Sequence, residues 1–279
     1  MPVRLQENAY GKCDVRLVKV ARGPERHEVK DLTVSTVCTG DFEAAYVAGD
    51  NRNVVPTDTM KNIIYATAAD HPLTTIEEFG LSLAERLLVY KQFIQIEITI
   101  EESIWEHLHL GGRLYPASFT RTPERRTAHI QAGRDGVVVR SGIADLLLLK
   151  TSGSAFTGFH QDTCTTLAET TDRLLQTSVK AAWGYVEGST AYADTWAQVR
   201  QHILESFARH TSLSVQHTLY TIGEAILDGV PAVADVCLSL PNQHCLAVDL
   251  AQFGIENRNE VFLPVIEPSG FITASIARA

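Results

Sequence analysis

The sequence lacks the short motifs that most often identify a nucleotide-binding or hydrolytic enzyme. None of G-x-G-x-x-G, G-x-x-x-x-G-K-S/T, G-x-S-x-G and H-E-x-x-H occurs in its 279 residues. A glycine-rich phosphate loop, a serine on a nucleophile elbow and a metalloprotease helix are therefore without support.

Basic charge and long apolar runs are also scarce. The 24 Lys and Arg residues against 33 Asp and Glu residues give a formal net charge of −9, which makes nucleic acid and anionic membrane surfaces poor partners. The four leucines from Leu146 to Leu149 form a run far too short to span a bilayer. We therefore expect neither nucleic acid nor membrane as a partner.

Cysteine is infrequent and odd in number. The five cysteines include no C-x-x-C pair, and no apolar segment typical of a signal peptide follows the N-terminus. This pattern favours reduced thiols in a cytoplasmic protein. The two imidazoles of His107 and His109 have no matching second pair at zinc-ligand spacing, so we expect surface or interface histidines and no metal site.

What the chain has is a hydrophobic content of 45%, enough for a sizeable core. Alternating apolar residues predict a hairpin over 14–21 and 28–38, and a strand over 94–101 in which Ile94, Ile96, Ile98 and Ile100 face one way. Gly111 and Gly112 are expected to turn this strand towards another around 118–122. Residues 41–56 are expected to be irregular.

Two helices are predicted between these strands. The first is expected to be capped by the side chain of Thr57 or Asp58, and the second follows the Thr75-x-x-Glu78 capping box. In the second half, the patterns predict three helices (166–175, 191–210 and 214–228) and seven strands (127–139, 143–151, 178–187, 233–240, 245–250, 260–266 and 271–277).

Paired strands separated by paired helices favour an α+β fold of antiparallel sheets with helices on one face. The order of elements predicts two β-β-α-α-β-β units, residues 1–135 and 136–279. No residue-level repeat accompanies this duplication.

The most distinctive segment is a corner between two predicted strands, Ser239-Leu240-Pro241-Asn242-Gln243-His244. Proline stiffens such a corner and cannot donate to a strand ladder. A solvated hairpin turn is the simplest interpretation of the corner alone. A stiff corner is also a place where Asn242 and His244 can be held in position for chemistry.

Three other polar residues have a structural and a functional interpretation. Thr57 and Asp58 are typical helix caps, but a helix N-terminus also suits an anionic or oxygen-rich ligand. Arg173, next to the apolar stripe of its predicted helix, is either solvated and paired locally or turned inward as a planar fork for a carbonyl and an adjacent nitrogen.

Four further residues are similarly open. Phe159 is either part of the core or a platform on which a flat heterocycle stacks. Val215 and Gln216 begin a predicted helix, where Gln216 is either a polar first-turn residue or an amide that reads a heterocycle edge. Lys12 is most simply a solvated lysine near the start of a strand.

Taken together and in this order, the segments resemble the urate oxidase (uricase) family. The matching segments are Tyr10-Gly11-Lys12 with Val15-Arg16-Leu17, Val55-Pro56-Thr57-Asp58-Thr59-x-Lys61-Asn62-x-x-Tyr65, Gly158-Phe159 with Thr165-Thr166-Leu167-x-Glu169-Thr170-x-Asp172-Arg173, Val215-Gln216-x-Thr218-x-Tyr220, and Ser239-Leu240-Pro241-Asn242-x-His244.

The resemblance implies the tandem T-fold, which has the predicted order of elements, assembled into an oligomeric barrel. It implies a homotetramer with active sites at subunit interfaces. It also implies the oxidation of uric acid by O2 to 5-hydroxyisourate and H2O2 in purine degradation, without a metal and without an organic cofactor.

Roles follow from the resemblance residue by residue. Arg173 would hold a carbonyl and ring nitrogen of urate, Gln216 the opposite edge, and Phe159 would stack beneath the ring. The backbone of Val215, and that of Asp58 from a neighbouring subunit, would complete the contacts in the ring plane. Lys12, Thr57 and His244 would form a proton relay, and Asn242 would hold O2 above the ring together with Thr57.

The chain departs from the family in two places. Gln243 stands between the corner's Asn and His, where the family commonly has Lys, and residues 160–164 replace a segment that commonly carries a basic residue and Tyr. Two other hypotheses remain at this point. T-fold relatives that act on pterins or other purines usually anchor the ring with Glu, and a purine-binding oligomer without catalysis would lack Lys12, Thr57 or His244.

Overall fold

The structure is a computed structural model that describes residues 3–278. The chain divides into two compact units between Gly142 and Ile143. The predicted boundary between the two repeats, at 135/136, stays a prediction.

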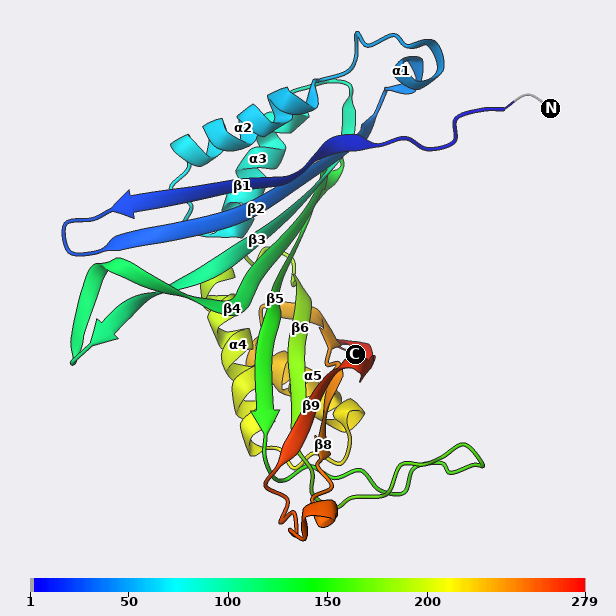
Figure 1. Cartoon of the computed structure of the whole chain (residues 1–279). Coiled ribbons are helices and arrows are strands. Elements are labelled where there is room, and N and C mark those ends of the chain that lie inside the picture. Colours follow the sequence, from blue (N-terminus) through cyan, green and yellow to red (C-terminus); the bar gives the residue numbers. More distant parts are fainter. Residues whose placement is uncertain (1–2, 279) are drawn as a thin grey trace. The chain divides into compact units, whose positions relative to one another are not determined.

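The first unit is an antiparallel sheet with two long helices on one face (Figure 1). Its strands lie in the order β1-β2-β3-β4. The elements are β1 (Tyr10–Arg22), β2 (His27–Gly40), α1 (Glu43–Ala48), α2 (Thr57–Asp70), α3 (Ile76–Leu88), β3 (Phe93–Leu110) and β4 (Arg113–Gly133).

The inward-facing isoleucines of β3 form the sheet side of this unit's hydrophobic core. Ile96, Ile98 and Ile100 are fully buried beneath α2 and α3, as predicted. Ile94 does not follow the prediction, because its side chain is 58% exposed while Phe93 is buried. The register between β2 and β3 shifts at this end, where Gly40 pairs with Phe93, and the shift takes Ile94 out of the inward row.

A buried ion pair connects helix α3 to the sheet. Glu77 in the first turn of α3 is fully buried, and its carboxylate accepts from Nη2 of Arg126 in β4 at 2.7 Å. The hydroxyl of Ser141 donates to the other carboxylate oxygen of Glu77. Charges this deep are tolerated only when paired, so the contact fixes how α3 lies on the sheet.

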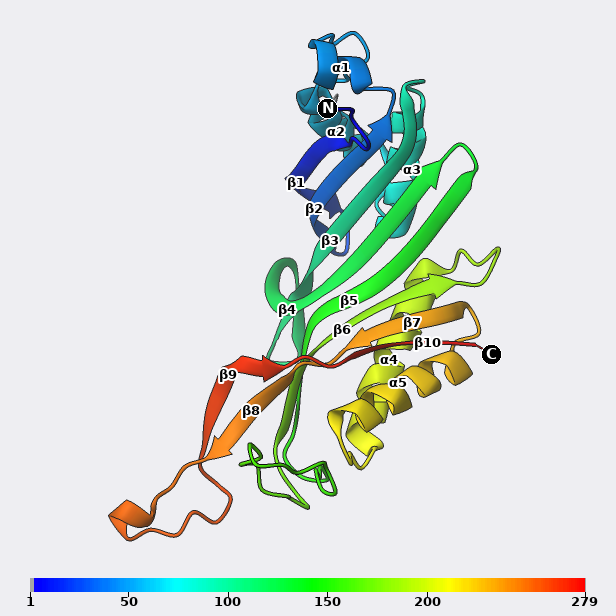
Figure 2. The ribbon, with the colours of Figure 1, turned by 90° about the vertical axis from the view of Figure 1, so that its right-hand side faces the viewer.

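The second unit repeats the plan, with α4 and α5 along one face of its sheet (Figure 2). Strand β5 (Gly136–Lys150) runs across the division of the chain. The sheet continues as β6-β7-β10, while β8 pairs with β6 and β9. The elements are β6 (Leu175–Tyr185), α4 (Tyr192–Arg209), α5 (Val215–Gly229), β7 (Val233–Ser239), β8 (Asn242–Ala247), the 3-10 helix η1 (Ala251–Phe253), β9 (Phe262–Gly270) and β10 (Thr273–Ala277).

The duplication extends to how the first helix of each pair ends. The ammonium of Lys19 in β1 donates to the carbonyls of Ala68 and His71 at the end of α2, at 2.8 and 2.7 Å. The ammonium of Lys150 in β5 donates to the carbonyl of His210 at the end of α4, at 2.7 Å. A cation on the last carbonyls satisfies them and complements the helix dipole.

The predicted α+β fold and its antiparallel sheets are confirmed, but the predicted helix at 166–175 is wrong. The Glu169 carboxylate accepts from the backbone N–H of Gly158 at 2.8 Å and so does not complete a capping box with Thr166. Thr170 pairs with Phe156 in an isolated bridge, and the amide of Arg173 donates to the Ser154 carbonyl. These contacts hold the segment extended, and a local pattern cannot reveal them.

Three smaller predictions also need correction. The segment 41–56 contains the short helix α1, whose C-terminus turns at Gly49 in the left-handed region. The predicted strand 127–139 crosses the two-residue turn that separates β4 from β5. The predicted caps Thr57 and Asp58 make no capping hydrogen bond, because α2 begins one residue earlier, with Pro56 in the N-cap position.

Each unit has one close contact between a helix and the sheet at a glycine. A methyl group at Gly80 in α3 would lie 2.4 Å from Cδ1 of Ile130 in β4. A methyl group at Gly223 in α5 would lie 2.2 Å from Cδ1 of Ile276 in β10. Both separations are shorter than carbon atoms tolerate, so glycine sets how near each helix lies to its sheet.

We expect Gly80→Ala to lower the free energy of unfolding by about 1–2 kcal/mol. Overpacking a filled core costs about 1–3 kcal/mol, and the better helix propensity of alanine returns at most about 1 kcal/mol. Denaturant unfolding measures the change. Ile130→Val removes the clashing methyl group, so the double variant should be more stable than the sum of the two single effects, and strict additivity would contradict this contact.

Candidate active site

The residues predicted for the site fall into two groups, one in each unit. Lys12, Thr57 and Asp58 belong to the first unit. Phe159, Arg173, Val215, Gln216, Asn242 and His244 belong to the second.

Tyr10 joins the two segments of the first group. Its phenolic oxygen accepts from the backbone N–H of Val55 at 2.9 Å, and its ring packs edge-on against Phe42. Val55 lies two residues before Thr57, and Tyr10 lies two residues before Lys12. One side chain therefore fixes the start of β1 against the entry to α2.

Thr57 and Asp58 occupy the exposed first turn of α2, with side chains free of any capping role. A hydrogen bond from Lys61 and its charge lower the pKa of the Asp58 carboxyl most, and Asn62 and Lys12 lower it further. A hydroxyl and helix N–H groups thus lie together at one exposed helix end.

In the second group, Arg173 and Phe159 both contact the ring of Phe156. The Phe156 and Phe159 rings are stacked, with centroids 4.8 Å apart and planes 13° apart. The Arg173 guanidinium carbon lies 5.2 Å from the centroid of the Phe156 ring. Among the described residues, the buried Nε of Arg173 has no hydrogen-bond partner, and burial lowers the pKa of this guanidinium.

The backbone around Arg173 is held by one neighbouring segment, residues 152–154. Its amide donates to the Ser154 carbonyl at 2.7 Å, and the Asp172 carboxylate accepts from the amide of Gly153 at 2.8 Å. The pKa of Asp172 is lowered by the hydrogen bond from the Ser152 hydroxyl and by backbone N–H donors. The loop that presents the guanidinium is therefore held in place by hydrogen bonds to residues 152–154.

The loop that holds Arg173 also contacts the segment just before Val215 and Gln216. The Ala155 amide donates to the Ser212 carbonyl at 2.7 Å. Ser214 then caps α5, because its hydroxyl accepts from the His217 amide at 3.0 Å. In the first turn of α5, Val215 is buried and Gln216 is exposed. Three segments distant in sequence thus meet beside Arg173.

The corner at Ser239-to-His244 is a kink in a continuing strand and not a hairpin turn. Strand β6 pairs Lys180 with Ser239 and Gln176 with Gln243, so β7 and β8 follow β6 in one register. Leu240 leaves this ladder and donates to the Ile272 carbonyl at 2.9 Å. Asn242 and His244 are consequently part of strand β8, both only half-buried.

Comparisons with known proteins decide what this arrangement belongs to. The family model described as Uricase matches residues 8–131 and 139–273, which is nearly the whole chain. The chain belongs to the uricase family. It is an oxidoreductase, and its reaction is the oxidation of urate.

Named uricases are similar over nearly the full length. The Arthrobacter globiformis uricase is 41% identical, over 99% of this chain and 90% of that protein. The Dictyostelium discoideum uricase is 39% identical, over 99% of this chain and 98% of that protein.

Solved structures carry the same fold. The crystal structure of the Arthrobacter globiformis uricase gives a TM-score of 0.93 at 40% identity, covering all of this chain and 96% of that one. A structure of Bacillus sp. TB-90 urate oxidase gives 0.82 at 26% identity, covering 98% of this chain and 100% of that one. The tandem α+β architecture of uricases is therefore the architecture of this chain.

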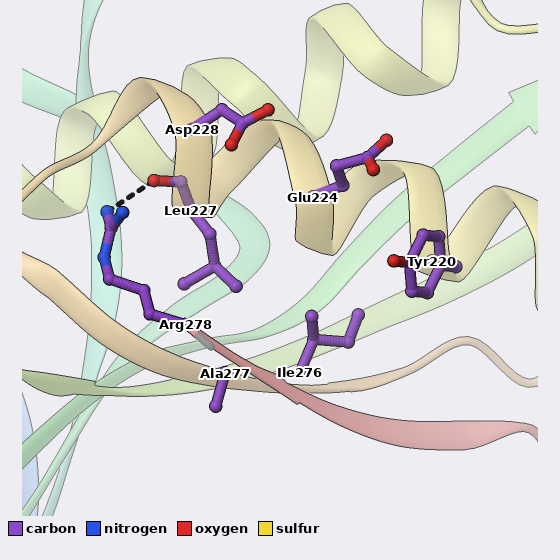
Figure 3. Close-up of a pocket in the computed structure, with 7 residues that line it drawn as sticks. All are labelled: Tyr220, Glu224, Leu227, Asp228, Ile276, Ala277 and Arg278. Atoms are coloured by element: carbon purple, nitrogen blue, oxygen red, sulfur yellow. Dashed lines mark hydrogen bonds between the residues drawn. The ribbon is translucent and has the colours of Figure 1, made fainter.

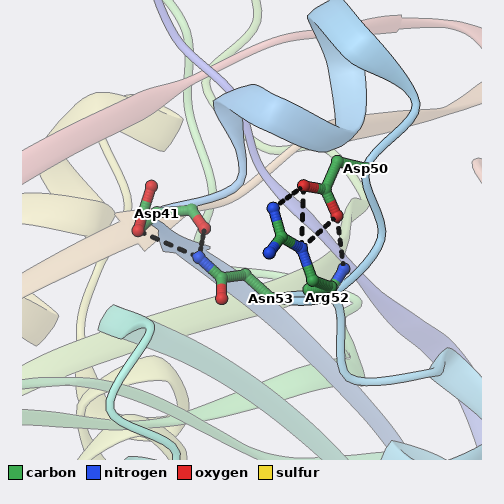
Figure 4. Close-up of polar contacts among 4 residues, drawn as sticks. All are labelled: Asp41, Asp50, Arg52 and Asn53. Carbon is green, nitrogen blue, oxygen red and sulfur yellow. Dashed lines mark hydrogen bonds and ion pairs between the residues drawn. The ribbon is translucent and has the colours of Figure 1, made fainter.

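Two pockets of this uricase lie away from the predicted residues. A pocket of about 450 Å³ opens between α5 and β10, lined by Tyr220, Glu224, Asp228 and Arg278 among others (Figure 3). A pocket of about 420 Å³ lies in the loop after β2. There Asn53 donates to Asp41, and Arg52 pairs with Asp50 (Figure 4). Neither is lined by a predicted site residue.

Three further observations concern the cysteines, the possible metal ligands and the helices of the chain. All five cysteines are unpaired. Across residues 3–278, no three His, Cys, Asp or Glu side chains are grouped to hold a metal ion. None of the helices in the same range combines the length and hydrophobicity needed to cross a bilayer.

Two residues beside this site escaped the sequence analysis. Phe156 carries both the Phe159 ring and the Arg173 guanidinium. Gln176 donates from Nε2 to Oε1 of Gln243 at 2.8 Å. Phe156 is an ordinary aromatic in a serine- and glycine-rich loop, and its three-residue spacing from Phe159 was the available signal. Gln176 had none, because its partner is 67 residues away.

Proposed function

We propose that this member of the uricase family oxidises uric acid with O2 to 5-hydroxyisourate and H2O2, as a step of purine degradation, using neither a metal nor an organic cofactor. The observation that carries the proposal is the Arg173 guanidinium. It is partly buried, rests over an aromatic ring and keeps an unpartnered Nε. Such a fork suits a flat anion that accepts two parallel hydrogen bonds.

The neighbouring groups complete the proposed urate site. Phe159 offers a ring face for stacking, and Gln216 offers one donor and one acceptor for the edge of the purine opposite Arg173. The backbone N–H of Val215 would contact the ring plane from the same helix end. That of Asp58 would do so from a neighbouring subunit.

The reaction needs electron transfer and proton movement. Urate gives two electrons to O2, and two protons convert the reduced oxygen to H2O2. A water molecule adds its oxygen to the ring and supplies the hydroxyl of 5-hydroxyisourate. An electron-rich urate anion can reduce O2 directly, so the protein's contribution is orientation, charge stabilisation and proton transfer.

In our proposal, Lys12, Thr57 and His244 move the protons. The ammonium donates, the hydroxyl donates and accepts, and the imidazole accepts at one nitrogen and donates at the other. Asn242 holds O2, and later water, above the ring together with Thr57. The hydrogen bond from the Val55 N–H to the Tyr10 hydroxyl, which holds the strand that carries Lys12 against the entry to α2, supports pairing Lys12 with Thr57.

We further propose a cytoplasmic homotetramer with active sites at subunit interfaces. The first-turn residues Thr57, Asp58 and Gln216 are all exposed on the single chain. Polar groups with proposed catalytic and binding roles, left open to solvent, are consistent with a site that a second copy completes.

We expect purified, metal-free protein to consume urate and to release H2O2 in equal molar amounts with EDTA present. Urate absorbance and a peroxide assay on the same sample measure both. Turnover that stops with the chelator and returns with a metal ion would refute cofactor-free oxidation. Absence of turnover by folded protein would refute the proposed reaction.

Thr57→Ala and Lys12→Met should each lower kcat by about 100-fold or more while changing urate affinity little, because general acid–base groups contribute on the order of 10²–10⁴-fold. Steady-state kinetics and equilibrium binding of urate under anaerobic conditions separate the two effects. A loss of affinity that matches the loss of rate would mean that these residues position urate instead of moving protons.

Mixing two inactive variants tests the interface. Thr57→Ala carries its defect in the first unit and Arg173→Met in the second. If each site takes one group from each of two copies, mixed assemblies contain intact sites. Refolding the two variants together in equal amounts should then restore about a quarter of wild-type activity. Activity no higher than that of either variant alone would place both groups in one chain's own site.

A further inference from the structure

The strand that carries Asn242 and His244 is held to its neighbour at one registered pair. Strand β8 pairs with β6 through Gln176 and Gln243. The preceding Pro241 has no N–H to donate, and Leu240 donates to Ile272 instead. On its other edge, β8 pairs with β9, with Asn242 opposite Gly270 and His244 opposite Val265, and the register shifts between these two pairs. The pair of Gln176 with Gln243 is therefore the contact that sets β8 relative to β6.

Gln176 binds β8 with both ends of its side-chain amide. Its Nε2 donates to Oε1 of Gln243 at 2.8 Å, and its Oε1 accepts from Sγ of Cys245 at 3.6 Å. Successive side chains on a strand alternate between faces. Gln243 and Cys245 thus point to the face opposite that of Asn242 and His244. Gln176 binds β8 on the face of Gln243 and Cys245.

The same residue connects this strand to the proposed urate anchor. Gln176 follows Arg173 by three residues, and the Arg173 backbone is itself fixed to Ser154. A single short segment therefore sets both the place of the guanidinium and the place of Asn242 and His244.

From these contacts we propose that Gln176 is a positioning residue for urate oxidation, which sets the distance between the bound ring and the groups that hold O2 and move protons. This inference rests on the proposed function. The hydrogen bond from the Gln176 amide to Gln243 distinguishes this chain from the common family pattern. The lysine that the family commonly has at position 243 offers no oxygen to accept from Gln176.

The test compares kcat and KM for urate in Gln176→Leu, Gln243→Leu and the double variant. We expect each single change to lower kcat by about 10- to 100-fold, because a displacement of about 1 Å costs roughly that much. KM should stay within about threefold, since Arg173, Phe159 and Gln216 remain. The double variant should be no slower than the slower single variant, because both changes break one contact.

Gln201→Leu is the matched control. Gln201 also donates from its side-chain amide, to Glu205 at 2.6 Å, but it lies on α4 and this bond joins two residues of that helix. Its kcat should equal that of the wild type. Gln176→Glu with Gln243→Lys restores a contact of opposite polarity and should recover kcat to within about threefold of the wild type.

The outcomes separate the two proposals. An active wild type whose kcat is unchanged by Gln176→Leu would overturn this inference alone. Additive losses in the double variant, or an equal loss in Gln201→Leu, would also overturn it. A wild type that does not oxidise urate would overturn the proposed function and this inference together. If Gln176→Leu fails to fold, Gln243→Leu tests the same contact from its partly exposed end.

Discussion

The close contact between helix and sheet at a glycine is the constraint on which each unit depends. Gly80 and Gly223 allow α3 and α5 to lie against Ile130 and Ile276 at distances where a larger residue would force the isoleucine side chain to shift. These contacts favour one depth of each helix on its sheet, and in the first unit the buried Glu77 ion pair favours one orientation. The contact of Gly223 with Ile276 helps to fix the position of α5, whose first turn carries Gln216.

In each unit, a few hydrogen bonds hold one part of the proposed site in position. A single phenol, that of Tyr10, holds the start of β1 against the entry to α2. In the second unit, backbone hydrogen bonds to Ser154 and Ser212 hold the loop that presents Arg173. The groups proposed to act on urate are thus placed by backbone geometry, which leaves their polar atoms available. That arrangement agrees with catalysis by orientation and charge.

The sequence predicted those elements whose signals are local. The alternation in β3 and the capping residues of α3 needed no distant partner, since the Thr75 hydroxyl accepts from Glu78 within its own turn. The helix expected at 166–175 failed because Glu169 bonds to Gly158 instead. The chemical roles came from resemblance to a family and not from pattern, and Gln176 was missed because only the pairing of β6 with β8 reveals it.

The lysine contacts at the ends of α2 and α4 have a consequence for how the chain folds. Lys19 lies 49 residues before the Ala68 carbonyl that it binds, and Lys150 lies 60 residues before that of His210. The last turn of each helix gains this partner only after a distant strand has arrived. The last turn of each helix and the docking of that strand therefore stabilise one another, and their contact forms only when a long loop closes.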